Sequence, residues 1–131
     1  LCAAASAVYK SFFLNVHEGP AGILTNPRTP SGQRILEAGM VLSNEPGFYK
    51  SGEFGIRIEN LVIIQNASTE GWLEFETITL FPIDRLLIEQ HLLLRYHLEW
   101  INDYHKLVLE QVGPLVEGPE MDWLRDACRT L

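Results

Sequence analysis

The hydrophobic pattern of the chain changes at Pro82, and this change limits what the chain can fold into. Before Pro82, short apolar and β-branched runs are separated by clusters of Gly, Pro, Asn and Ser, which is typical of β-strands joined by turns. After it, Tyr96, Trp100, Tyr104 and Val108 recur every four residues, as on one face of an α-helix. The sequence therefore predicts an α+β chain in which antiparallel strands precede a helical tail of about 50 residues.

Turn signals divide the first part into separate elements. We expect strands at 12–16, 38–45, 54–64 and 72–81. Residues 17–34 hold three prolines and three glycines, so they predict a loop. Pro46-Gly47 closes the strand at 38–45, and the sequence KSG at 50–52 indicates a hairpin-like connection to the next strand.

Two helices are expected in the tail. The first is helical in pattern from about Glu89, and Gly113-Pro114 stops it. The second lies in 118–131, with Pro119 near its first turn, where the missing amide hydrogen of proline is tolerated.

Composition excludes several kinds of partner. The net charge is -7 with no basic block, so we expect neither nucleic acid nor an anionic membrane as a partner. No apolar run approaches the ~18 residues of a membrane span. Cys2 and Cys128 form no disulfide framework or zinc-cluster pattern, so we expect plain thiols and a cytoplasmic protein. Residues 1–11 open with Leu and lack the basic flank of a secretory signal, which indicates an incomplete or altered N-terminus.

Glu45 and Glu59 lie on two expected neighbouring strands. Adjacent antiparallel strands place facing side chains about 5 Å apart, and two carboxylates at that distance repel each other. A proton, a cationic side chain or a metal ion must compensate. Arg57 shares the face of Glu59 in a strand, and we expect it to neutralise one of the two carboxylates but not both.

Two interpretations of this pair stay open at the level of the residues. Hard divalent cations prefer carboxylate oxygens, and one carboxylate can bridge two ions, so the pair can form a metal site. Alternatively, Glu45 caps a turn and Glu59 is a surface residue of an edge strand. His17 follows an expected strand and precedes Gly19-Pro20, which is also consistent with a purely structural histidine.

Several motifs, in order, resemble those of aminopeptidase P, the Xaa-Pro aminopeptidases of the pita-bread metallopeptidase family. They are LNVHEGP, EAGMVLSNEPGFY and GIRIENLVII, followed by FETITLFPID and WINDYH. The resemblance spans roughly residues 12–105 and implies the C-terminal portion of a pita-bread fold followed by a helical tail. It divides the chain into a partial metallopeptidase catalytic domain at 1–81, of which 1–11 are atypical, and a helical C-terminal extension at 82–131.

The resemblance also implies roles for particular residues. In the family, two aspartates, one histidine and two glutamates hold two divalent metal ions, and Glu45 and Glu59 match the glutamates. Glu59 would bridge both ions and act catalytically, and His17 matches a catalytic histidine that steadies the carbonyl of the substrate. Tyr49 and Arg57 match positions that hydrogen-bond around the ligands. Mn²⁺ is the first expectation for the metal, with Zn²⁺ or Co²⁺ as alternatives.

The implied reaction removes the N-terminal residue of a peptide with proline at the second position, using a metal-activated water. The stretch SAVYKSFF before His17 lacks the glycine-rich motif of the metal-binding histidine, and the two aspartates have no match. We therefore expect a C-terminal fragment with an incomplete site that is inactive alone. The alternatives are a non-catalytic binding or dimerisation module of the same fold, forming a homodimer through its C-terminal region, and a prolidase-like dipeptidase fragment.

Overall fold

The computed structural model describes residues 21–23 and 28–131, which form two compact units that divide between Thr79 and Leu80. The elements of the first unit are η1 (Ser31–Gln33), β1 (Val41–Asn44), β2 (Gly47–Lys50), β3 (Phe54–Arg57), β4 (Asn60–Asn66) and β5 (Leu73–Thr77). Those of the second are η2 (Arg85–Leu87), η3 (Gln90–Leu92), α1 (Arg95–Val112), η4 (Gly113–Leu115) and α2 (Gly118–Ala127). The α+β class with antiparallel strands is confirmed, and the strand expected at 12–16 lies outside the described residues.

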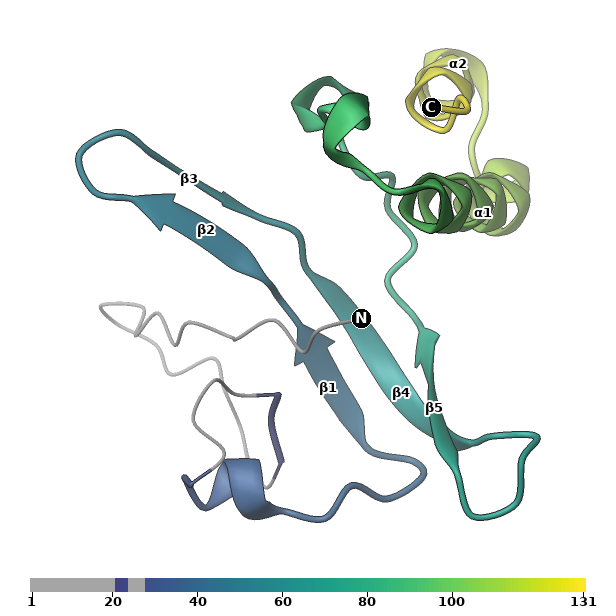
Figure 1. Ribbon diagram of the computed structural model, residues 1–131. Coiled ribbons are helices and arrows are strands. Elements are labelled where there is room, and N and C mark those ends of the chain that lie inside the picture. The colour runs from purple at the N-terminus through teal and green to yellow at the C-terminus, as the bar shows by residue number, and fades with distance from the viewer. Residues whose placement is uncertain (1–20, 24–27) are drawn as a thin grey trace, which may run out of the picture. The chain divides into compact units, whose positions relative to one another are not determined.

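The first unit is built on an antiparallel sheet in the order β1-β4-β5 (Figure 1). Leu42 on β1 lies directly opposite Val62 on β4, and Ile64 follows on the same face, so these three buried side chains form the core of the unit. Partly buried apolar residues pack against this core: Ala21, Ile23, Leu36 and Met40.

The strands around Pro46 differ from the prediction. The strand expected to close at Pro46-Gly47 ends at Asn44, but the chain stays extended and continues as β2. The single strand expected at 54–64 is likewise divided into β3 and β4. Proline has no amide hydrogen, so at this point the Ile58 N–H donates to the Pro46 carbonyl at 3.2 Å and no bond returns. The ladder of backbone hydrogen bonds is therefore interrupted at Pro46, while the two segments of the chain remain side by side.

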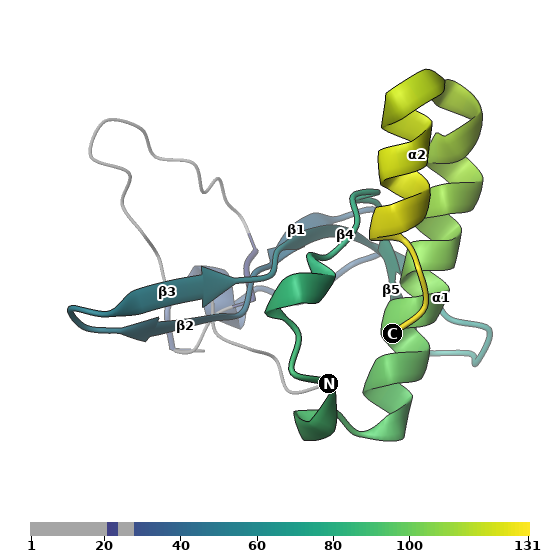
Figure 2. The same ribbon diagram turned by 90° about the horizontal axis from the view of Figure 1, so that it is seen from above.

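The second unit packs α2 against α1 (Figure 2). Tyr104 and Val108 on α1 contact Leu124 on α2 in a buried core. Partly buried residues surround it: Ile83, Leu109, Val112, Val116 and Cys128. The predicted stop of the first helix at Gly113-Pro114 and the start of the second around Pro119 are confirmed. Within the described residues, no helix has both the length and the apolar character needed to cross a membrane.

The first helix begins later than predicted, at Arg95 rather than near Glu89. Asp84 and Glu89 explain the difference, because their carboxylates accept the backbone N–H groups of Leu86 and His91. Such local bonds favour isolated 3-10 turns over a continuous helix.

Candidate metal centre

Glu45 and Glu59 are brought face to face by a register that both strand pairs share. Asn44 lies opposite Asn60 in the β1–β4 pair, and Gly47 lies opposite Arg57 in the β2–β3 pair. Between these pairs the register is unchanged, so Glu45 is opposite Glu59. The neighbouring Pro46–Ile58 pair carries the remaining hydrogen bond, which makes 45–59 a pair of the closer, non-hydrogen-bonded type. The break at Pro46 therefore falls where the two carboxylates meet.

Glu45 is almost completely buried, with 3% of its side chain exposed. Its Oε2 atom forms an ion pair with Arg57 Nη1 at 2.9 Å, and its Oε1 atom accepts a hydrogen bond from Ser43 Oγ at 2.9 Å. A buried carboxylate is costly unless a counter-charge and hydrogen bonds compensate for the lost water, and both are present here. Ser43 lies two residues before Glu45, on the same face of the chain, and was not among the predicted site residues.

Arg57 contacts both glutamates, which corrects the expectation that it would neutralise only one. Its Nη1 atom pairs with Glu45, and its Nε atom lies 3.5 Å from Glu59 Oε2. The guanidinium group has several donors in one plane, and these can serve two carboxylates on facing strands. Arg57 and Glu59 remain open to solvent, with 37% and 44% of their side chains exposed.

The pair fits part of a metal site. Two opposed carboxylates are the oxygen ligands that hard divalent cations prefer. However, no group of three or more His, Cys, Asp or Glu residues among the described residues could hold a metal ion. Further ligands would have to come from outside these residues. His17 also lies outside them, so its relation to the pair stays a prediction.

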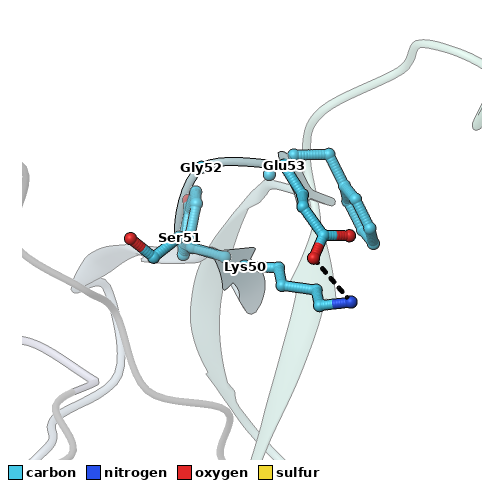
Figure 3. Close-up of a pocket in the computed structure, with 7 residues that line it drawn as sticks. Lys50, Ser51, Gly52 and Glu53 are labelled. Carbon is cyan, nitrogen blue, oxygen red and sulfur yellow. Dashed lines mark ion pairs between the residues drawn. The ribbon is translucent and has the colours of Figure 1, made fainter.

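Tyr49 lies on the same face of the β2–β3 hairpin as Arg57. The reason is that Gly47, directly opposite Arg57, is two residues before Tyr49 on the same strand. Tyr49 faces Gly55 directly across the β2–β3 pair. The hairpin beyond it closes through the turn at Ser51 and Gly52, where Lys50 Nζ and Glu53 Oε1 form an ion pair at 2.9 Å around a shallow depression (Figure 3).

The helical unit has a buried ionisable residue of its own, His105 on α1. Its Nε2 atom accepts a hydrogen bond from the Ile83 N–H at 3.1 Å. Burial lowers the pKa of His105 below its usual value, and the positive charge of Arg85 lowers the pKa further. The beginning of the unit is also held by Tyr104, whose hydroxyl donates to the Phe81 carbonyl at 2.8 Å.

The chain belongs to metallopeptidase family M24. The sequence model of this family matches residues 11–66, and the model described as the C-terminal region of peptidase M24 matches residues 71–131. Within the family, the chain resembles the Xaa-Pro aminopeptidases, as the motifs in the sequence indicate.

The similar proteins carry this activity in their names. A probable Xaa-Pro aminopeptidase P of Coprinopsis cinerea is 44% identical over 121 residues, which are 86% of this chain and 19% of the relative. Xaa-Pro aminopeptidase 1 of Dictyostelium discoideum is 42% identical over 127 residues, which are 91% of this chain and 20% of the relative. The chain thus spans about a fifth of the length of the curated relatives it matches.

A solved structure supports the same assignment. The crystal structure of X-prolyl aminopeptidase from Caenorhabditis elegans, described as a cytosolic enzyme with a di-nuclear active site, superposes with a TM-score of 0.66. It is 36% identical and covers 73% of this chain, which corresponds to 17% of that protein. The likeness to a pita-bread fold is therefore confirmed for the part of the chain that is covered.

Proposed function

We propose that this chain is the C-terminal part of a metal-dependent Xaa-Pro aminopeptidase, a hydrolase that removes the N-terminal residue of peptides with proline at the second position. One observation carries the proposal: Glu45 and Glu59 face each other in a shared register, with Arg57 paired to both. The names of the relatives and the di-nuclear active site of the C. elegans enzyme support it.

In this proposal, Glu45 and Glu59 supply two carboxylate ligands of a centre for two divalent ions, with Mn²⁺ as the first candidate and Zn²⁺ or Co²⁺ as alternatives. The remaining ligands, two aspartates and a histidine in the family, come from residues outside those described. Once bound, the ions would supply an activated water as the nucleophile. The chain in isolation is then expected to be inactive.

The two glutamates differ in burial, and the difference suggests different roles. Glu45 is buried and held by Ser43 and Arg57, so it acts as a fixed ligand. Glu59 is more exposed, so it can take the proton of the attacking water and deliver it to the proline nitrogen. His17 would donate a hydrogen bond to the scissile carbonyl oxygen, where negative charge develops. Tyr49 and Arg57 would orient the carboxylates.

The first experiment is a calorimetric titration of the chain with Mn²⁺. Binding of two ions per chain would mean that the centre is completed within the chain or its assembly, and cleavage of Xaa-Pro peptides is then assayed. Weak binding is the result expected of a chain that contributes only part of the ligand set.

A second measurement decides whether the pair binds metal even when affinity is low. Mn²⁺ is paramagnetic and broadens the NMR signals of nuclei close to it. We expect the amide signals around Glu45 and Glu59 to broaden first in a ¹⁵N-labelled chain, and the Glu45→Gln and Glu59→Gln variants to lose this effect. Glu70→Gln, which changes an exposed carboxylate of the β4–β5 turn, is the matched control. Broadening that is unchanged in both glutamine variants would overturn the proposal.

A second candidate is a dimerisation module carried by the helical unit, with a homodimer through the C-terminal region. The observation that favours it is a set of strongly exposed apolar side chains in this unit: Leu86, Leu87, Leu92 and Leu115. Association measured by analytical ultracentrifugation that persists in Glu45→Gln and is lost in Leu86→Glu would support this candidate independently of the metal centre.

The proposal assigns residues 1–81 to the catalytic domain and 82–131 to its C-terminal extension, and it locates the protein in the cytoplasm. The description of the C. elegans enzyme as cytosolic supports this location. Imaging of the tagged full chain would test it, and accumulation in a membrane-bounded compartment would contradict it.

A further inference from the structure

The face of the hairpin that carries the glutamates also carries two glycines. From Glu45 toward the turn of the hairpin, the residues that face this side are Glu45, Gly47 and Tyr49. On the facing strand β3, Arg57 lies opposite Gly47, and Gly55 lies opposite Tyr49. Both glycines are therefore direct neighbours of residues assigned above to the candidate metal centre.

The backbone does not require glycine at either position. The glycines that adopt positive φ among the described residues are Gly39, Gly52, Gly71 and Gly118. Gly47 and Gly55 lie in strands with ordinary dihedral angles, where glycine costs stability relative to residues with a side chain. Their presence therefore needs another explanation.

The ring of Tyr49 supplies that explanation. A Cβ atom added at Gly55 would lie 2.6 Å from Tyr49 Cδ1 and 3.1 Å from Cε1. A Cβ atom added at Gly47 would lie 2.7 Å from both Cε2 and the hydroxyl oxygen. At distances below 3.0 Å the ring would have to shift, so in its present position it occupies the space of both missing side chains. One edge of the ring lies next to Gly55, and its hydroxyl end lies next to Gly47.

This arrangement gives the Tyr49 ring a direction. Gly47 is the residue between Tyr49 and Glu45 on this face and lies opposite Arg57. The hydroxyl is thus turned back along the strand toward the end of the hairpin where Arg57 pairs with Glu45 and Glu59. A side chain at either glycine would displace the ring from this position.

We propose that Gly47 and Gly55 are positioning residues that form a seat for Tyr49 and direct its phenol toward the carboxylate pair. That the seat serves a metal centre rests on the proposed function, whereas the seat itself does not. Because the ring packs directly on backbone, it also replaces the contacts that the two glycines lack, as aromatic residues do for glycines on facing strands.

A double-mutant cycle, carried out without metal, tests the seat. In the otherwise unchanged chain, Gly55→Ala forces an overlap with the ring, and we expect the equilibrium constant for unfolding to rise about tenfold. In the Tyr49→Ala background the overlap is gone, and the same alanine should lower that constant about two- to fivefold, as expected for replacing glycine in a strand. Tyr49→Phe keeps the ring, so in that background Gly55→Ala should again be destabilising.

The sign of the stability change caused by Gly55→Ala tests whether the ring of Tyr49 occupies the space above Gly55. A reversal of sign between the native and Tyr49→Ala backgrounds supports the seat, and the same cost in both overturns it. If Gly55→Ala does not fold at all, recovery of folding in the Tyr49→Ala/Gly55→Ala chain supports the proposal, and failure to recover overturns it.

An NMR measurement separates positioning from stability. In the native chain, the ring current of Tyr49 should shift the Hα signals of Gly47, and Tyr49→Ala should abolish this shift. Gly55→Ala should change the shift at Gly47 in molecules that remain folded, which a uniform loss of stability would not do. An unchanged Gly47 signal in Gly55→Ala would overturn the inference. Neither measurement involves metal, so failure of the metal centre in the Mn²⁺ experiments would leave the result on the seat unaffected.

Discussion

Each compact unit buries one acidic or basic side chain among the described residues, and the two are held in opposite ways. Glu45 in the sheet unit is paired with the cationic Arg57 and accepts a hydrogen bond from Ser43. His105 in the helical unit has no carboxylate partner among the contacts of the described residues and accepts a backbone N–H instead. The first arrangement stabilises a charge, and the second requires a neutral ring.

The partners of the two residues show what each arrangement is suited for. Arg57 and Glu59 are partly exposed, so the charges around Glu45 can be reached by a ligand. His105 is fully buried, and its partner Ile83 belongs to the segment of the helical unit that precedes α1. A buried charge with accessible partners suits binding and chemistry, whereas a buried neutral acceptor suits architecture.

Removal of the counter-charge should have the largest effect. Arg57→Ala leaves the carboxylate of Glu45 buried and without its cationic partner, and we expect the free energy of unfolding to fall by about 2–3 kcal/mol. The value lies below that of a fully buried pair because Arg57 is itself 37% exposed and partly screened by water. Urea denaturation measures it.

The matched control is Arg34→Ala. Arg34 pairs with Glu37 at 3.1 Å, but 48% and 61% of the two side chains are exposed. We expect a change below about 0.5 kcal/mol, since exposed pairs contribute little. Similar losses of stability in Arg57→Ala and Arg34→Ala would mean that the burial of Glu45 does not determine the loss in Arg57→Ala.

The next effect concerns the acceptor in the helical unit. His105→Leu removes the acceptor of the Ile83 N–H, and we expect a loss of about 2 kcal/mol from an unsatisfied, partly buried donor. His105→Gln places an amide oxygen near the position of Nε2, so this variant should recover part of that loss. Thermal unfolding followed by circular dichroism compares the two variants, and equal stabilities would exclude the acceptor role.

Acidification should lower the free energy of unfolding through His105. Burial lowers the pKa of His105, so between that lowered pKa and the ordinary value of 6.5 the unfolded chain binds more protons than the folded chain. The free energy of unfolding therefore rises with pH across this window and falls on acidification. The slope from this one group is at most about 1.4 kcal/mol per pH unit. His105→Gln should remove this component, and a pH dependence between about 7 and 5 that is the same in this variant would contradict it.

The sequence predicted the elements better than it predicted where they are interrupted. Alternating apolar runs and Gly-Pro signals located the strands, and the stop at Gly113-Pro114 was correct. The pattern at Pro46 predicts the end of a strand, whereas the chain passes this residue in an extended conformation and pairs again as β2. A proline inside an extended segment removes only one hydrogen bond of the ladder. From the local sequence alone, such a proline cannot be distinguished from one that begins a turn.

The candidate site shows the same limit for side chains. Strand alternation put Arg57 on the face of Glu59, but it says nothing about how far a guanidinium reaches, so the pairing of Arg57 with both glutamates was missed. Ser43 had a usable signal, since it lies two residues before Glu45 on the same face. His105 had none, because helical periodicity marks the buried face of α1 without telling which polar residue on it meets a backbone N–H.

The smallest expected effect concerns the neutral hydroxyl of Tyr104 beside His105, which also accepts a long hydrogen bond from the Phe81 N–H at 3.4 Å. Tyr104→Phe keeps the buried ring but removes the hydroxyl that donates to the Phe81 carbonyl at 2.8 Å, and we expect a loss of about 1 kcal/mol in the free energy of unfolding. Tyr96→Phe on the same helix changes an exposed side chain and should be close to neutral. If Tyr104→Phe is also neutral in urea denaturation, the start of the helical unit is held by His105 and by packing. If instead it costs as much as Arg57→Ala, a neutral bond to the backbone is as important to this chain as the buried charge pair, and the contrast between the two units is wrong.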